Sequence, residues 1–409
     1  MRLLAGALLL ALLAGCVTPA SVSPANAPGA ADLLKMIPSF GKVVKVGDLG
    51  NEPVVRVAPD GTVYVAALQH VYVSVDNGTS FKEVDFKGAL PIYASDSALA
   101  VAPDGHAYVA FDWPYAGETA VCDSKDKGAT WHCSPIVVPG ATDRMWIVAP
   151  TEKDAYLVTG EQLDRPTFAA THDAGQSWSM TSMDWTEEVQ GEDLVWDPVL
   201  KEVVEAADNP DGNGGWGVRT IATDGTYKGF APVALPAPGT ASMGVDAAGS
   251  WWAATCADPK AKECAPAVAS SADQGKTWTI HNLTFSGKTL LMPFVTAGAA
   301  GQVAMGWYET NASSADDATA EWRFVVAHST DGQTFRTDVL SPEPVHKGGM
   351  CRAVTCLGDN RFAGDFIGLA FGPDGSLHAT WNKQTGAKLL PVGQSPTPYT
   401  EVDYARTTS

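Results

Sequence analysis

One unit recurs seven times along this chain of 409 residues, and it restricts the fold more than any other feature. Each copy is an apolar run, a turn of the Pro-Asp-Gly kind and a second apolar run, as in residues 57–65. The copies begin at residues 57, 101, 148, 196, 245, 297 and 371, so the first six are spaced by 44 to 52 residues and a longer insertion precedes the seventh. A period of about 40–50 residues with several strands per unit predicts a β-propeller.

The rest of the sequence agrees with short strands joined by tight turns. The chain holds 40 Gly, 27 Pro and 13 Trp, and no long stretch repeats apolar residues at the i, i+3, i+4 spacing of an amphipathic helix. Proline fixes φ and glycine accepts a positive φ, so Pro-Asp-Gly suits the hairpin between the first two strands of a blade. We therefore predict an all-β fold.

A second motif, Ser/Thr-x-Asp-x-Gly-x-Thr/Ser-Trp/Phe, follows most copies of the first. It stands at residues 74–81, 124–131, 171–178 and 271–278, and one residue shorter at 329–335. The Asp and Ser/Thr side chains can bond backbone groups of a turn, glycine supplies the left-handed conformation, and the aromatic ring packs on the neighbouring blade. We predict five such turns, built on Asp76, Asp126, Asp173, Asp273 and Asp331.

The second motif is the Asp box, and the chain resembles the sialidase-like BNR-repeat β-propellers, in a lipoprotein form, over about residues 40–409. Residues 142–148 resemble the Asp-Arg/Lys-x-Trp strand of that family, and residues 364–370 resemble its Gly-Asp-Tyr/Phe-x-Gly-Leu strand. The resemblance implies that Asp boxes hold the turns between third and fourth strands and take no part in catalysis. The family's enzymes have six blades. The repeats predict seven here, with six as the alternative because residues 194–230 match the unit poorly.

The two ends of the propeller are expected to pair with each other. Residues 402–409 match the third strand of a unit and stop where its Asp box would begin. Residues 42–46, ahead of the first unit, can supply the missing fourth strand. This pairing would close the ring and remove two exposed sheet edges.

The first residues are typical of a bacterial lipoprotein signal peptide. A short positive start precedes an apolar run that is too short for a permanent membrane helix, and the Leu-Ala-Gly-Cys sequence ending at Cys16 resembles the lipobox, whose cysteine is acylated. We predict a signal peptide at residues 1–15, a flexible tether at 16–38 and one propeller domain at 39–409. The protein would be exported and lipid-anchored to the cell envelope, on the periplasmic side or the cell surface. An ordinary cleaved signal with a chance cysteine is the alternative.

The six remaining cysteines agree with export. They form three close pairs in the sequence, which read as local disulfides in an exported chain. Six cysteines allow 15 connectivities, of which we favour the sequential one. A zinc site is the rival interpretation, but no His/Cys quartet has metal-ligand spacing. The favoured pairs are Cys122–Cys133, Cys256–Cys264 and Cys351–Cys356.

The charge balance argues against one class of partner. The formal charge is −19, and removing residues 1–15, which carry only Arg2, gives −19 − 1 = −20. Nucleic-acid binding requires clustered Lys and Arg, so we expect no nucleic-acid partner. We expect contact with the membrane through the lipid anchor only.

Acidic residues stand where the first strands of the blades should begin. In a propeller these strands line the central channel. We call the end where they begin the top, and the end with the Pro-Asp-Gly turns and Asp boxes the bottom. We predict a ring of carboxylates around the top of the channel. The acids at the strand starts are Glu52, Asp96, Asp143, Glu192, Asp193 and Asp365, and the ends of the second strands add Asp112, Glu161, Asp208 and Glu309.

Three functions fit such a ring: a cation site, with calcium as the cation considered, an acid/base pair, or a surface for a basic partner. The structural alternative is that these acids cap turns and bond backbone N–H groups where blades join. No other cofactor is predicted.

Sialidase chemistry demands more than this chain shows. The family holds its substrate carboxylate with three arginines, and it uses a Tyr–Glu pair and an Asp. The family's Arg-Ile-Pro strand is absent, the first unit offers only Arg56, and an acidic ring would repel an anionic sugar. As an enzyme, the chain would be a glycoside hydrolase of the exo-sialidase type, with Asp143, Arg144 and Asp365 as catalytic candidates.

We expect instead a binding module that presents its acidic top face to a glycan, a peptide or a protein outside the cell. A scaffold for the assembly of exported proteins is a further alternative, which no sequence feature separates from the binding module. Aromatic residues near the predicted top loops could stack on a ligand. The predicted ligand-binding residues are Glu52, Asp96, Trp113, Asp143, Arg144, Glu161, Glu192, Asp193 and Asp365.

Overall fold

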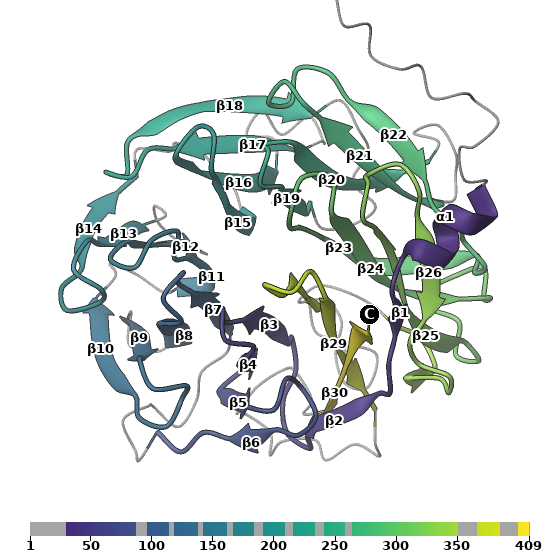
Figure 1. Ribbon diagram of the computed structural model, residues 1–409, viewed down its shortest axis with the longest axis horizontal. Helices are drawn as coiled ribbons and strands as arrows, with labels where there is room; N and C mark the ends of the chain where they lie inside the picture. Colours follow the sequence, from purple (N-terminus) through teal and green to yellow (C-terminus); the bar gives the residue numbers. More distant parts are fainter. Residues whose placement is uncertain are drawn as a thin grey trace, which may run out of the picture.

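Seven antiparallel sheets stand in a ring around a central channel (Figure 1). The fold is a seven-bladed β-propeller, as the seven repeats predict, and the six-bladed alternative is wrong. The described part contains one helix, α1 (Ala30–Met36). It is too short to cross a membrane. The computed structural model describes residues 30–86, 96–113, 118–137, 142–161, 167–183, 191–208, 216–233, 241–257, 264–350, 366–384 and 400–408.

The first four blades each take four consecutive strands in chain order, from the channel outwards. Blade 1 consists of β3 (Val54–Val57), β4 (Val63–Ala67), β5 (His70–Ser74) and β6 (Lys82–Glu83). Blade 2 consists of β7 (Ser97–Val101), β8 (Ala107–Trp113), β9 (Glu118–Ser124) and β10 (His132–Val137). Blade 3 consists of β11 (Thr142–Val148), β12 (Ala155–Glu161), β13 (Thr167–Thr171) and β14 (Ser179–Ser182). Blade 4 consists of β15 (Gly191–Asp197), β16 (Glu202–Asp208), β17 (Trp216–Ile221) and β18 (Tyr227–Val233).

Blades 5 and 6 follow the same order, and blade 6 adds a short fifth strand on β25. Blade 5 consists of β19 (Met243–Val245), β20 (Trp251–Cys256), β21 (Pro266–Ser271) and β22 (Thr279–Asn282). Blade 6 consists of β23 (Thr289–Ala297), β24 (Val303–Thr310), β25 (Glu321–Ser329), β26 (Arg336–Val339) and β27 (His346–Lys347).

Blade 7 joins the two ends of the propeller, as predicted. Its inner strands are β28 (Gly368–Phe371), β29 (Leu377–Lys383) and β30 (Glu401–Thr408). The outer edge of β30 is paired by two N-terminal strands, β1 (Ser39–Phe40) and β2 (Val44–Gly47). The closing strand therefore comes from the predicted part of the sequence, but in two pieces on either side of residues 41–43.

Alternate side chains of one strand face opposite neighbours in the ring. In β8, Val109 and Phe111 belong to the apolar cluster shared with blade 1, whereas Tyr108 and Ala110 belong to the cluster shared with blade 3. Both faces of a blade are therefore buried, and the inner strands carry apolar residues in nearly continuous runs. A one-residue slip would exchange the two sets of neighbours, so the side-chain pattern fixes the register.

The five predicted Asp-box segments form hydrogen-bonded turns at the bottom. In the first, Ser74 donates to Asp76 at 2.7 Å and accepts from the Gly78 amide at 2.8 Å, while the Ser80 hydroxyl donates to Asp76 at 2.6 Å. The hydroxyl bonds from Ser80 and Ser74 hold the pKa of Asp76 at about 2. The corresponding Asp residues of the other four turns accept equivalent bonds; they are Asp126, Asp173, Asp273 and Asp331.

The N-terminal segment meets the propeller at its bottom. Ser39 pairs with Thr408, and Arg406, two residues earlier in β30, pairs with His378 just after the bottom turn of blade 7. Phe40 packs edge to face on His328 of β25, with ring centroids 5.5 Å apart. In Figure 1, α1 is drawn beside the outer strands of blade 6. Strand β1 therefore joins the propeller at the bottom of the ring.

Two of the three predicted disulfides are present. Cys122 and Cys133 face each other across β9 and β10, and Cys256 and Cys264 bridge the segment between β20 and β21. Cys351 and Cys356 lie outside the described residues, as does Cys16. Disulfides persist in oxidising compartments, so the bonds indicate an extracytoplasmic protein.

Candidate functional site

The top ends of the inner strands carry a layer of polar side chains above the apolar cores between blades. Side chains of four predicted acids can be described there: Glu52, Asp96, Asp112 and Glu309. Glu52, Asp112 and Glu309 are buried, with 4, 0 and 5% of their surface exposed, and Asp96 is half-buried. These acids therefore stand inside the junctions between blades rather than on an open rim.

Glu52 begins blade 1 in an unusual backbone conformation. Its φ is +52°, a region that residues other than glycine rarely adopt. Its amide donates to the Asn51 side chain at 2.8 Å, and Asn51 also accepts from Asn382 of blade 7 at 2.6 Å. Thr400 donates to Asn382 at 3.1 Å, which extends this network across the closure of the ring. The acid is thus held where the first and last blades meet, and the surrounding bonds stabilise the strained backbone.

Glu309 lies in the junction between blades 5 and 6. It accepts a hydrogen bond from the Ser286 hydroxyl and another from the Trp307 indole at 3.0 Å. Trp307 belongs to the apolar cluster of that junction. The carboxylate is therefore a hydrogen-bonding partner for the buried indole of Trp307 and for the exposed hydroxyl of Ser286.

Asp96 and Asp112 stand together between blades 2 and 3. The Asp112 amide donates to the Asp96 carbonyl at 3.3 Å. Each acid lies two residues above an alanine, Ala98 or Ala110, that packs in the cluster shared by blades 2 and 3. Because side chains alternate along a strand, both carboxylates are on the face of blade 2 that meets blade 3.

Three threonines stand at the same level, together with the buried Met145, which pairs with Thr159. Thr119 lies two residues above Val121 on β9, and Thr159 and Thr167 lie two residues above Leu157 and Ala169 on β12 and β13. All three of these apolar residues belong to the same cluster. We call the set of Asp96, Asp112, Thr119, Thr159 and Thr167 the 2/3 layer. Its threonines were missed by sequence reasoning, because a threonine in a strand carries no functional signal by itself.

Two hydroxyls of the 2/3 layer have no hydrogen-bond partner. The Oγ1 atoms of Thr119 and Thr167 are buried and unpaired, and the residues are 0 and 2% exposed. Thr159 Oγ1, by contrast, accepts from the Thr167 amide at 3.3 Å. A buried hydroxyl without a partner costs about 1–3 kcal/mol, so the two are notable in a layer that already holds two carboxylates.

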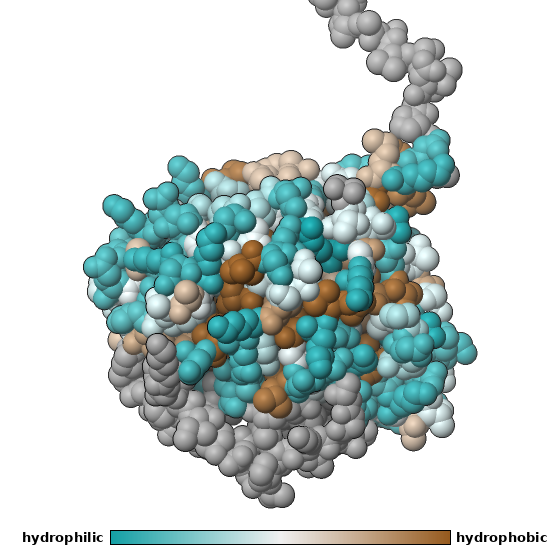
Figure 2. Space-filling view, turned by 60° about the horizontal axis from the view of Figure 1, so that its bottom comes forward, coloured by the Kyte–Doolittle hydropathy of each residue, from teal (hydrophilic) through white to brown (hydrophobic). Residues whose placement is uncertain are grey.

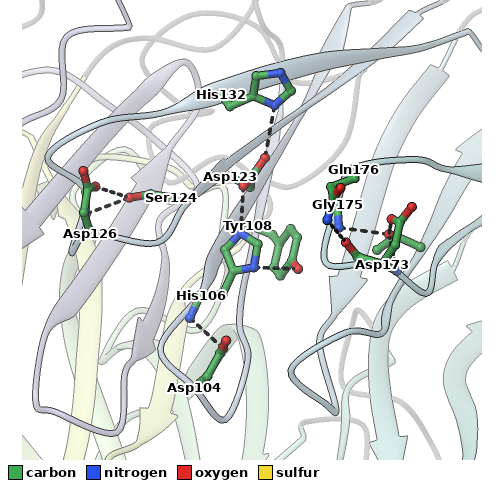
Figure 3. A network of polar contacts seen from close by, with 12 residues as sticks. Asp104, His106, Tyr108, Asp123, Ser124, Asp126, His132, Asp173, Gly175 and Gln176 are labelled. Carbon is green, nitrogen blue, oxygen red and sulfur yellow. Dashed lines mark hydrogen bonds and ion pairs between the residues drawn. The ribbon is translucent and has the colours of Figure 1, made fainter.

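The bottom end of the same junction is differently arranged (Figure 3). His106 stands between Tyr108, whose hydroxyl is 2.9 Å from Nδ1, and Asp123, whose carboxylate is 2.7 Å from Nε2. Asp123 also lies 3.4 Å from the exposed His132. Burial, with a contribution from the nearby carboxylates, raises the pKa of Tyr108. Both ring nitrogens of His106 and the Tyr108 hydroxyl therefore have a hydrogen-bond partner within this network.

The central channel is apolar and aromatic. A cavity of about 70 Å³ is lined by the inner strands of six blades, blade 2 being the exception. Trp146 and Phe294 each pack edge to face on Phe366, with centroids 5.0 and 5.8 Å apart. Arg56, which donates to its neighbour's carbonyl at 2.8 Å, is the sole charged residue among the described lining residues. The channel therefore contains a small cavity whose lining side chains are mainly apolar.

Several predicted site residues are placed only by their backbone. The side chains of these residues are outside the described part, so the structure does not place them relative to one another. They are Trp113 in β8, Asp143 and Arg144 in β11, Glu161 in β12, Glu192 and Asp193 in β15, and Asp208 in β16. Asp365 lies outside the described residues altogether. Within the described part, no group of three or more His, Cys, Asp and Glu side chains is arranged to hold a metal ion.

Exposed apolar side chains are spread over the described surface. Figure 2 shows them between hydrophilic side chains on one face. The most exposed are Val75 in the first bottom turn, Met36 in α1 and Val199 in a turn of blade 4, at 72, 71 and 58%. They come from separate parts of the ring, so they do not form one docking patch.

Comparison with known proteins reveals a shared fold and no family. No protein-family model matches the chain, and no curated protein matches it. Among solved structures, one described as "YCF48 bound to D1 peptide" matches 90% of this chain and 96% of its own, with a TM-score of 0.55 and 14% sequence identity. The likeness is one of architecture. The relationship to sialidase-like BNR proteins remains an expectation from the motifs.

Proposed function

We propose that this chain is a lipid-anchored extracytoplasmic propeller that binds an extended segment of a protein ligand at its top face. The observation that carries the proposal is the lining of the channel, where aromatic and aliphatic side chains from six blades surround a cavity with one described charged residue, Arg56. Such a lining suits recognition by shape and apolar contact, with a few polar groups giving orientation.

The N-terminal segment joins the propeller at the end opposite the proposed binding face, and this placement supports binding at the top. Strand β1 joins the propeller at the bottom end of β30, beside the turn at Asp374 and Gly375. A lipid anchor ahead of α1 would therefore hold the bottom toward the membrane. The top would face away from the membrane, where a ligand can reach it.

The comparison supports a peptide or protein as the ligand class. The structurally similar protein is described with a bound peptide, and propellers bind many kinds of partner on one architecture. For this chain the ligand class rests on the apolar channel. Recognition of a glycan is the competing prediction, and it would use aromatic stacking near the top loops.

The proposal is tested by selecting binders from a random 12-residue peptide library and, in parallel, screening a glycan array. We expect enrichment of peptides with a bulky apolar side chain, measured afterwards by fluorescence anisotropy. Trp146→Ala or Phe294→Ala should weaken binding at least about tenfold, since truncating a central aromatic anchor typically costs 2 kcal/mol or more. Trp131→Ala, a half-buried ring in a bottom turn, is the matched control. Glycan binding without peptide binding, or equal losses in the control, would contradict the proposal.

A further inference from the structure

We infer that Phe366 fills the position that an aromatic side chain of the ligand takes in the channel. The inference rests on the proposed peptide function and names the class of side chain that the channel selects. Three rings from blades 3, 6 and 7 meet there: Trp146 and Phe294 each pack edge to face on Phe366, with centroids 5.0 and 5.8 Å apart. We call the space that Phe366 fills against these two rings the aromatic slot.

Phe366 is the ring of these three that stands nearest the top. The last ladder residues at the bottom of the three inner strands are Val148, Ala297 and Phe371. Trp146 precedes its own by two residues, Phe294 by three and Phe366 by five. A ligand that enters from the top face therefore meets Phe366 before it reaches the other two rings.

The aromatic slot is full in this structure. Trp146, Phe294 and Phe366 expose only 7, 6 and 5% of their surface. The channel cavity that they line measures about 70 Å³. A protein cavity that holds a benzene ring measures about 150 Å³. The channel can therefore take up a ligand's ring only if Phe366 moves.

Phe366 is also the ring whose backbone lies outside a strand. Trp146 and Phe294 are ladder residues of β11 and β23, whereas β28 begins at Gly368, two residues after Phe366. Gly368 packs directly on blade 1, since a Cβ there would lie 2.9 Å from the Pro53 carbonyl oxygen. Ile367 is 3% exposed and packs against Gly306 of blade 6. A rotation of Phe366 can therefore open the slot while β28 keeps its pairing.

An aromatic side chain of the ligand would restore the contacts that Phe366 gives up. Its ring can pack edge to face on Trp146 and Phe294, as the Phe366 ring does, whereas an aliphatic side chain restores only the burial. A charged side chain would be desolvated among apolar groups. Because the slot is open in only a fraction of the molecules, the apparent affinity is reduced by that fraction. Truncating Phe366 should therefore strengthen binding, whereas truncating Trp146 or Phe294 weakens it.

The test uses the full chain in detergent, with N-acetylphenylalaninamide as the probe in calorimetry and thermal melting. Phe366→Ala should bind the probe with a Kd of about 10⁻³ M, and about 10 mM probe should raise its Tm by about 2 °C. The wild type should bind at least about tenfold more weakly, because its own ring fills the slot. N-acetylleucinamide should bind Phe366→Ala about fivefold more weakly than the phenylalanine amide. Phe366→Leu keeps an apolar side chain, so it should fold even where Phe366→Ala does not, and it should bind the probe about threefold more tightly than the wild type.

Phe324→Ala is the matched control. Phe324 belongs to the same apolar cluster as Phe366, is fully buried and stacks on Trp381 at 4.9 Å, but it is not among the described residues that line the channel cavity. Its truncation removes the same atoms and leaves Phe366 in place. The probe should therefore bind Phe324→Ala no better than the wild type.

The 12-residue peptides selected against the wild type provide a second measurement. They should bind Phe366→Ala about tenfold more tightly than the wild type, the opposite of the change expected for Trp146→Ala. Selected peptides that bind Phe366→Ala no more tightly would overturn the inference and leave the proposed function standing. The inference is also overturned if the probe does not distinguish Phe366→Ala from Phe324→Ala, or if the leucine amide binds equally well. If the probe binds Phe366→Ala selectively but no peptide binds the wild type, the slot stands and the proposed function fails.

Discussion

Gly78, in the first bottom turn of blade 1, lies directly against the ring of Tyr404 in the last strand of the chain, with no space for a Cβ atom between them. The Tyr404 hydroxyl in turn is 2.6 Å from Nδ1 of His378. One contact therefore links a turn near the start of the propeller to the strand that ends it. The closure of the ring depends on side-chain packing at the bottom as well as on strand pairing.

Replacing Gly78 by alanine should destabilise the fold by more than its backbone conformation alone explains. Gly78 has φ +81° and meets Tyr404, whereas Gly105 has φ +90° and nothing near its Cβ position. Gly105→Ala therefore measures the cost of a left-handed alanine, about 1–2 kcal/mol. Gly78→Ala should cost at least about 2 kcal/mol more, because Tyr404 must move. Urea denaturation of both variants checks this, and equal losses would show that Tyr404 yields freely.

His378 should make the protein sensitive to acid. Burial, aided by Arg406, lowers the pKa of His378 from 6.5 to about 4. Between these values the unfolded chain binds a proton that the folded chain does not, so stability falls as pH falls from about 6.5 to 4. The loss is up to about 3 kcal/mol, at 1.36 kcal/mol per pKa unit. Tm measured from pH 7 to 4.5 should fall less in His378→Gln than in the wild type, and identical slopes would contradict the assignment.

Asp403 should have the opposite pH dependence. Burial, reinforced by Glu401, raises its pKa from 3.8 to about 6, although Lys383 lies 3.9 Å away and acts against the shift. The folded chain holds the proton more tightly, so this group favours the fold below about pH 4 and that benefit is lost as pH rises through 6. Asp403→Asn should stabilise the protein by about 1–3 kcal/mol at pH 7.5 and have little effect at pH 4. Equal destabilisation at both pH values would mean that the carboxylate is needed for packing.

The disulfide of blade 2 should contribute to stability through the hairpin it bridges. Cys122 and Cys133 are separated by 11 residues and connect β9 to the outermost strand β10. Changing both to serine should cost about 2–3 kcal/mol, mainly by freeing the unfolded chain. Denaturation of the double variant with and without dithiothreitol checks this, because the reductant should then act only on the remaining bonds. A double variant as stable as the oxidised wild type would contradict the expectation.

The predicted lipid anchor has a direct test. Cys16→Ser should move the protein from the membrane fraction to the soluble fraction of cells that export it, since acylation of that cysteine is the predicted attachment. Mass spectrometry of the wild-type N-terminus should show a modified cysteine. Ala14→Ser, a small change within the same signal, is the control for export itself. Soluble wild-type protein would favour an ordinary cleaved signal.

The periodic parts of the sequence predicted most of the architecture. Seven turn units, the first six regularly spaced, predicted the number of blades. The match of residues 402–409 to a third strand predicted that residues 42–46 pair with the end of the chain, and in the structure Val44 pairs with Tyr404. These features could be predicted because they are local and repeated. The split of the closing strand into β1 and β2, and the added strand β27, have no repeated signal and were not predicted.

The candidate site was less accessible to sequence reasoning. The position of Glu309 at the end of a strand suggested an exposed acid, but the side chain is buried in a junction, where it accepts hydrogen bonds from Trp307 and Ser286. Thr119 and Thr167 belong to different blades, and their common layer exists only once the blades pack. The burial of a side chain in a propeller depends on the facing blade, which is about 45 residues away in the sequence.

The pairing of the first strands with the last also sets the order in which the molecule can be completed. Val44 pairs with Tyr404, which lies 404 − 44 = 360 residues later in the sequence. Six blades can therefore be made before the strand that pairs with residues 44–47 has been synthesised. During synthesis or export the growing arc presents an unpaired edge at each end, and contacts of such long range form slowly. We expect the time spent as an open arc, rather than the stability of any single blade, to limit how much of this protein matures at high expression.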